Sequence, residues 1–310
     1  MIVRMSKARR TSIVLGLSLP LAVGGTLAAT QIATGSSPVP PGPSTRMLHV
    51  SGGAIAYDDA GSGPVVICVP SLGDVRAEYR FLRPKLLAAG FRVVTMDLRG
   101  QGESSTGFSD YTSPAIGSDI LALARHLDAG PVSVVGTSIA GGAAAWAAAQ
   151  APDLISRLVL IGPFTRNHGG DAALGLLLNV ALRRPWGAAF WTWYFPNLYP
   201  DQQPADFKPY LAHLRSSLSE SGRLEAMRAM MNRDDSEVER SLERVQAPTL
   251  VVMGSRDPDF KKPEEEAAWV AANVHGTVLM VDGAGHYPHA ELPEQVGPRI
   301  VTFLAGGDAA

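Results

Sequence analysis

Six short apolar runs, rich in valine, isoleucine and leucine, recur along the chain and are separated by segments of helical character such as 79–88 and 114–127. The runs cover residues 65–69, 92–96, 132–135, 158–161, 249–253 and 278–281. Continuous apolar strands that alternate with helices predict an α/β fold, with a mostly parallel sheet covered by helices on both faces. Ahead of them, residues 47–60 alternate around Gly52-Gly53 and predict an antiparallel hairpin.

This alternation stops after the fourth run, and roughly eighty residues of helical and loop character follow before the fifth. Because this is too long for a connection, we predict a core made of residues 46–162 and 246–305 and a helical lid at 163–245. The lid is rich in aromatic and methionine residues, namely Trp186, Phe190, Trp191, Trp193, Tyr194, Phe195, Met227, Met230 and Met231. Most should form the lid's own core, and some should roof the site with an apolar, adaptable surface.

The first 34 residues differ from the rest of the chain. Four basic residues, Arg4, Lys7, Arg9 and Arg10, precede an uncharged run over residues 11–33. Such a pattern predicts an export segment over residues 1–34, either a signal peptide cleaved after Ala28 or a membrane anchor. The paired arginines resemble a twin-arginine signal. Residues 35–45, rich in proline, serine and glycine, predict a flexible linker, and the protein is expected to be extracytoplasmic, secreted or anchored by its N-terminus.

Composition indicates a large folded core and excludes some classes of function. The chain has 310 residues, 46% of them hydrophobic and 18% charged, enough for a large core. A formal net charge of -2, with no basic stripe or zinc-spaced cysteines, gives no reason to expect nucleic-acid binding. The single cysteine, Cys68, lies inside an apolar run, so it predicts a core residue and no intramolecular disulfide.

The third apolar run leads directly into a serine flanked by small residues and then into an alanine-rich helix. In residues 134–142, Gly136 and Ala140 stand two places on either side of Ser138. A strand can reverse into a helix within so few residues, and hold a serine hydroxyl out at the sheet edge, only where these positions are small. Glycine is usual at both, so Ala140 adds one methyl group. The pattern predicts that Ser138 is a nucleophile.

Two further polar residues follow the last two apolar runs. Asp257 comes just after the fifth run, and His286 follows the sixth within Gly-Ala-Gly-His. A serine nucleophile needs a base, which an imidazole can provide, and a carboxylate fixes the tautomer of that imidazole. The chain order Ser138, Asp257, His286 is that of the α/β-hydrolase triad. Asp259 and His289 lie close by and are alternatives for the acid and the base.

Several motifs in the same order strengthen this interpretation, and together they resemble a lid-bearing serine hydrolase of the α/β-hydrolase fold superfamily over roughly residues 47–305. They are the strand and loop at 64–73, the Asp-x-Arg-Gly-x-Gly-x-Ser loop at 97–104, the strand at 158–163 and the histidine loop at 285–294. The glycines at 100 and 102 suggest a tight loop, so Asp97 and Arg99 are interpreted as structural.

The resemblance implies an oxyanion hole formed by the backbone amides of Ile139 and Leu72. The family's His-Gly is replaced here by Pro70-Ser71, which leaves the amide of Ser71 or a side-chain donor as alternatives to Leu72.

The resemblance also implies a metal-free and cofactor-free esterase that forms an acyl-enzyme on Ser138 and acts on a small apolar, ester-like substrate. Alternatives are a haloperoxidase or perhydrolase, a thioesterase, a lactonase, a carbon-carbon hydrolase, or a triad-bearing protein that only binds or signals, because the fold does not fix the chemistry. Residues 11–33 or the lid could associate with a membrane.

Overall fold

The computed structural model describes residues 45–167 and 172–307. The predicted export segment at 1–34 and nearly all of the predicted linker at 35–45 lie outside the described residues. Among the residues described, no helix has the length and apolar character that a membrane crossing requires.

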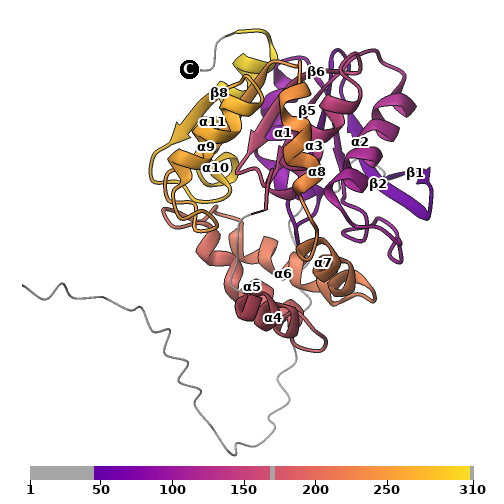
Figure 1. Ribbon diagram of the computed structural model, residues 1–310, viewed down its shortest axis with the longest axis vertical. Coiled ribbons are helices and arrows are strands. Elements are labelled where there is room, and N and C mark those ends of the chain that lie inside the picture. Colours follow the sequence, from indigo (N-terminus) through magenta and orange to yellow (C-terminus); the bar gives the residue numbers. More distant parts are fainter. Residues whose placement is uncertain (1–44, 168–171, 308–310) are drawn as a thin grey trace, which may run out of the picture. The chain divides into compact units, whose positions relative to one another are not determined.

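An eight-stranded sheet forms the centre of the fold, in the order β1-β2-β4-β3-β5-β6-β7-β8 (Figure 1). The strands are β1 (Arg46–Val50), β2 (Gly53–Ala60), β3 (Val65–Val69), β4 (Arg92–Met96), β5 (Val132–Thr137), β6 (Ile155–Ile161), β7 (Thr249–Gly254) and β8 (Thr277–Val281). β2 pairs antiparallel with β1 and β4, and the other pairs are parallel. The hairpin, the six predicted strands and the α/β-hydrolase fold class are therefore confirmed.

Helices cover both faces of the sheet, as the continuous apolar runs predict. The core helices are η1 (Arg76–Arg80), α1 (Leu82–Ala88), α2 (Ser113–Leu127), α3 (Ile139–Gln150), α9 (Pro263–Asn273), α10 (Pro288–Glu291) and α11 (Pro293–Leu304). Ile67 and Val69 of β3 share a core cluster with residues of α2, α3 and α9, whereas Val66 and Cys68 share one with residues of α1 and α11. Cys68 is fully buried, as expected.

The residues between β6 and β7 form helices and no strand where the structure describes them; these helices are the insertion. They are α4 (Ala172–Ala181), α5 (Gly187–Tyr194), η2 (Phe195–Leu198), α6 (Phe207–Ser219), α7 (Arg223–Met231), α8 (Ser236–Ser241) and η3 (Leu242–Arg244). α8 and η3 pack on α3, and Val238 and Leu242 belong to the main core. α4 to α7 lie beyond one edge of the sheet (Figure 1).

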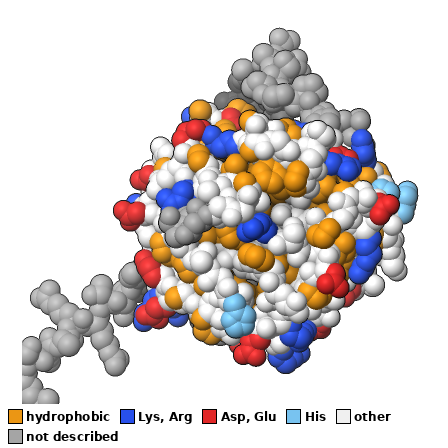
Figure 2. All heavy atoms as spheres, turned by 90° about the horizontal axis from the view of Figure 1, so that it is seen from above, with side chains coloured by type: hydrophobic (Ala, Val, Ile, Leu, Met, Phe, Trp, Pro, Cys, Tyr) orange, Lys and Arg blue, Asp and Glu red, His pale blue; other side chains and the backbone are white. Residues whose placement is uncertain are grey.

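Charged side chains of both signs are spread over the face of the protein shown in Figure 2, with hydrophobic side chains among them. This mixture agrees with the small formal net charge of -2. On this face, the described residues form no basic stripe of the kind that binds nucleic acid.

Candidate active site

The turn from β5 into α3 holds Ser138 in a strained conformation. Its φ of 60° lies in the left-handed region, where a non-glycine residue costs of order 1–3 kcal/mol. A Cβ atom at Gly136 would lie 2.5 Å from the backbone oxygen of Ala140, so only glycine fits there. The position before Ser138 must therefore be small for a steric reason, as the sequence indicates. Ala140, on the other side of Ser138, is fully buried.

Two backbone hydrogen bonds fix this turn against the segment that follows β6. The Ser138 amide donates to the carbonyl of Ile161 over 2.8 Å, and the Phe164 amide donates to the carbonyl of Ser138 over 3.1 Å. Between these two partners lies Gly162, whose φ is 48°. A Cβ atom on Gly162 would lie 3.1 Å from both Asp257 Oδ2 and His286 Nδ1. The serine turn and the acid-histidine pair thus meet at the same edge of the sheet.

His286 and Asp257 form a buried pair. His286 Nδ1 lies 2.8 Å from Asp257 Oδ2, and the two side chains are 2% and 0% exposed. Asp259 Oδ2 lies farther from the same nitrogen, at 3.6 Å, while the Asp259 amide donates to Asp257 Oδ1 over 3.0 Å. Of the two aspartates left open by the sequence, Asp257 makes the closer contact with the histidine.

The charges around His286 favour its protonated form. Burial lowers the pKa of His286, but the carboxylates of Asp257 and Asp259 outweigh this effect and raise the pKa to about 9. These three residues are also the one group with the spacing of metal ligands among the described residues. An imidazolium satisfies both carboxylates in this arrangement.

His289, the alternative base, belongs to a different buried pair. Its Nε2 lies 3.2 Å from Glu78 Oε1 without the geometry of a hydrogen bond, and each side chain is 1% exposed. The other oxygen of Glu78 accepts a hydrogen bond of 2.7 Å from the Ser71 amide. The structure therefore brings His286, and not His289, to Asp257.

The bond from Ser71 to Glu78 also bears on the second oxyanion donor. Because the Ser71 amide already donates to a buried carboxylate, it is engaged away from any substrate. The Leu72 amide, in contrast, has no hydrogen-bond acceptor among the described residues. Ile139 is the first residue of α3, so its amide precedes the hydrogen-bond ladder of the helix. Leu72 and Ile139 thus remain the two candidates for an oxyanion hole.

Further contacts tie the loop of residues 70–75, which we name the oxyanion loop after its predicted role, to its surroundings. The Ser71 hydroxyl bonds to the Tyr287 hydroxyl, next to His286, and the Tyr210 hydroxyl of α6 bonds to Asp74. Burial raises the pKa of the Asp74 carboxyl well above its ordinary value, and the nearby Glu78 adds to this. The oxyanion loop is therefore bonded both to the histidine loop and to the insertion.

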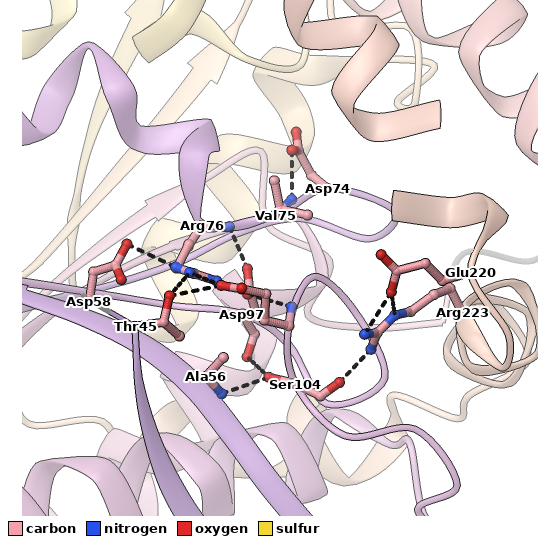
Figure 3. Close-up of polar contacts among 11 residues, drawn as sticks. Thr45, Ala56, Asp58, Asp74, Val75, Arg76, Asp97, Ser104, Glu220 and Arg223 are labelled. Atoms are coloured by element: carbon pink, nitrogen blue, oxygen red, sulfur yellow. Dashed lines mark hydrogen bonds and ion pairs between the residues drawn. The ribbon is translucent and has the colours of Figure 1, made fainter. Parts of the chain in front are cut away.

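Arg76, directly after the oxyanion loop, connects it to Asp97 (Figure 3). Its amide donates to Asp97 Oδ1 over 2.7 Å, and its guanidinium contacts Asp97 and Asp58. Arg99 in turn binds Asp119 over 2.8 Å. These buried contacts support the interpretation of Asp97 and Arg99 as structural residues.

Glu78 was not identified from the sequence, and no local signal marks it. It lies in a 3₁₀ turn, seven residues after its partner Ser71 and far along the chain from His289. Asn167, another polar residue after β6, binds Asp234 and the Asp235 amide of the insertion rather than the histidine pair. Its neighbour His168 lies outside the described residues.

A sheet of this order, with a serine, an aspartate and a histidine beyond the carboxyl ends of β5, β7 and β8, defines an α/β-hydrolase architecture. Comparison with known families agrees: the chain belongs to the alpha/beta hydrolase family, whose profile matches residues 66–298.

The curated relatives match this chain either over a short stretch or at low identity. The chain is 35% identical over 119 residues to uncharacterized proteins of Mycobacterium bovis and Mycobacterium tuberculosis, an alignment that covers 38% of this chain but only 35% of theirs. It is 28% identical to BpoC of Mycobacterium tuberculosis, provisionally assigned as a non-heme bromoperoxidase, over 81% of this chain and 97% of that protein.

Solved structures show the same fold. A bromoperoxidase from Bacillus anthracis is 20% identical, with a TM-score of 0.74 over 84% of this chain and all of its own. A thermophilic esterase from Thermogutta terrifontis is 25% identical, with a TM-score of 0.69 over 85% of this chain and 98% of its own. The solved structures show the fold, the family profile shows the family, and neither identifies the substrate.

Replacing Glu78 tests the buried pair beneath the oxyanion loop. We expect Glu78→Ala to lower the free energy of unfolding by about 2 kcal/mol, since it leaves the buried Ser71 amide without its acceptor and removes the carboxylate beside His289. Urea unfolding measures this loss. Glu294→Ala is the matched control, because Glu294 pairs with Lys85 at the surface and should contribute less than about 1 kcal/mol. Equal losses in the two variants would contradict the role of Glu78.

Proposed function

We propose that the protein is a serine hydrolase that cleaves an ester or related acyl bond through an acyl-enzyme on Ser138. The observation that carries this proposal is the buried pair of His286 and Asp257, 2.8 Å apart, at the sheet edge where the strained turn holds Ser138. A buried imidazole fixed by a carboxylate beside a serine has the chemistry of an activated nucleophile.

In the proposed mechanism, Asp257 holds Nδ1 of His286 and leaves Nε2 to take the proton of the Ser138 hydroxyl as it attacks the carbonyl. The resulting oxyanion accepts hydrogen bonds from the amides of Ile139 and Leu72. The imidazolium then gives its proton to the leaving alcohol. Water activated by the same imidazole hydrolyses the acyl-enzyme, releases the acid and restores Ser138.

Apolar contacts around the oxyanion loop favour a substrate with an apolar acyl or aromatic portion. Leu72 packs against a cluster of the insertion that includes Leu224 and Met227. A Cβ atom at Gly73 would lie 2.8 Å from both Met227 Cε and the Trp191 indole, and Trp191 Nε1 donates to the Gly73 carbonyl over 3.1 Å. The insertion acts in this proposal as a lid whose inner side meets the acyl group.

The names of the relatives support two chemistries. The esterase from Thermogutta terrifontis agrees with ester cleavage, whereas the bromoperoxidase relatives agree with a cofactor-free haloperoxidase or perhydrolase that uses the same serine. We favour the esterase because the apolar contacts at the oxyanion loop suit an acyl group. In this proposal the segment at 1–34 exports the enzyme.

Ser138 can be tested directly. We expect a fluorophosphonate probe to label the wild-type protein and short-chain nitrophenyl esters to be hydrolysed, and we expect Ser138→Ala to abolish both, because it removes the nucleophile. Ser133→Ala is the control, since Ser133 lies on the same strand and its hydroxyl bonds to that of Ser156, away from the histidine pair. Equal labelling of Ser138→Ala and Ser133→Ala would refute the enzymatic proposal.

The pKa of His286 predicts the pH dependence. Because the base must be neutral, kcat/KM should rise with pH until His286 loses its proton, near pH 9 in the free enzyme. Asp259→Asn removes one of the two carboxylates that favour the imidazolium, so the rising limb should move to lower pH. Asp282→Asn, in an exposed loop, should leave it unchanged. An identical limb in all three proteins would argue against His286 as the base.

Substitution of two neighbouring methionines of α7 can test where the acyl group of the substrate binds. Met227 and Met230 are both fully buried, but Met227 contacts Gly73 of the oxyanion loop, whereas Met230 belongs to the main core. Met227→Ala should shift kcat/KM toward esters with longer acyl chains, because it opens space beside the oxyanion loop. Met230→Ala should lose stability without this shift. Chain-length profiles that change equally would exclude Met227 from the acyl site.

A further inference from the structure

Exposed apolar side chains are concentrated in one part of the insertion. Among the described residues, six large hydrophobic side chains are exposed, and five of them lie in or beside α4 and α5. They are Leu176 (68% exposed), Leu177 (56%), Val180 (42%), Trp186 (53%) and Trp193 (70%). Single exposed hydrophobic residues are ordinary, but a cluster marks an interaction surface.

Three apolar side chains of α4 are exposed to solvent. Leu176, Leu177 and Val180 are spaced i, i+1 and i+4, which places them on one side of the helix. Asn179, on another side, exchanges two hydrogen bonds of 2.8 and 2.9 Å with Asn232 at the end of α7. The helix is therefore fixed to the insertion by its amide side, and its leucine side faces away from the protein.

α5 extends the same surface. Trp186 Nε1 donates to the Val180 carbonyl over 3.2 Å, so the indole lies at the end of α4 and its one polar group is already bonded. Trp186, Phe190 and Trp193 follow at i, i+4 and i+7, and the Phe190 and Trp193 rings are 5.9 Å apart. Trp186 and Trp193, with Leu176, Leu177 and Val180, form the α4–α5 face, on helices at the far end of the insertion from the sheet (Figure 1). Phe190 is half-buried and packs on the cluster that includes Leu224 and Met227.

The two charged residues within the segment that forms the α4–α5 face are both positive. From residue 172 to residue 200 the sequence has two charged residues, Arg183 and Arg184, and both are exposed. Arg184 donates to the backbone carbonyl of Glu220 over 3.1 Å, whereas the exposed guanidinium of Arg183 makes no hydrogen bond or ion pair with the part of the chain that the structure describes. Exposed tryptophan and leucine next to arginine is the composition that binds the interface of a bilayer, with the arginines beside anionic headgroups.

We propose that the α4–α5 face docks on an anionic lipid surface. Tryptophan suits the headgroup region because its ring is amphipathic, the leucines reach the acyl boundary, and Arg183 meets the lipid phosphates. The predicted export segment would bring the chain to such a surface. The proposal uses no residue of the candidate active site, so it stands or falls separately from the hydrolase function.

A fluorescent label can report contact at this face in the full-length chain. Cys68 is the only cysteine and is fully buried, so a thiol-reactive nitrobenzoxadiazole dye attaches selectively to an introduced cysteine. We expect Leu176→Cys to show a blue shift with phosphatidylglycerol vesicles, and quenching when those vesicles carry nitroxide lipid. Met47→Cys is the matched control, because Met47 is 43% exposed on β1 and lies close to the N-terminal segment 1–44, which the structure does not describe.

The outcomes separate docking from its alternatives. A response at Met47→Cys without one at Leu176→Cys would mean that the N-terminal segment alone meets the lipid, and it would overturn the proposal. A blue shift at Leu176→Cys that grows with protein concentration in the absence of vesicles would instead identify a second copy as the occupant. Equal responses to phosphatidylcholine and phosphatidylglycerol vesicles would overturn the anionic preference, which we expect Arg183→Gln to weaken several-fold.

Discussion

The turn at Ser138 is the constraint on which the rest of the site depends. The chain passes from β5 into α3 with so little room that the carbonyl of Ala140 occupies the space where a side chain at Gly136 would lie. The same turn bonds to Ile161 and Phe164, and the glycine between them leaves space for the pair of His286 and Asp257. A side chain at either glycine would separate the serine from its partners, so close backbone packing assembles the site.

Buried carboxylates hold the oxyanion loop in place. Pro70 and Ser71 stand where the family usually has His-Gly, and in this chain the Ser71 amide is held by Glu78. Asp97 binds Arg76 at the other end of the loop, and Asp74 lies between them with Tyr210. Each of these acids is fully or almost fully buried and would be costly without a partner. The loop is therefore fixed by its polar contacts as well as by apolar packing.

The sequence could predict those features that depend on local patterns. Apolar runs located the strands to within one or two residues, except that β6 begins three residues before the predicted run. The position of Asp257 and His286 after two such runs predicted that they would meet. The pairing of Glu78 with His289 could not be predicted, because it joins residues far apart in the chain with no motif around either. The exposure of Trp186 and Trp193 could not be predicted from the sequence either. Because α5 is apolar on several sides, its periodicity does not distinguish the face exposed to solvent from the face that packs against the rest of the protein.

α5 and η2 connect the outer surface of the insertion to both halves of the candidate site. Trp193 lies on the exposed face, Trp191 bonds to Gly73 of the oxyanion loop, and Tyr194 bonds to Asp259 beside His286. In η2, the Leu198 carbonyl accepts the His286 amide. Ser138 itself is almost fully buried, with 6% of its surface exposed. Any force on the outer face of α5, including the lipid contact proposed above, would therefore act on the oxyanion loop and on the surroundings of the histidine together.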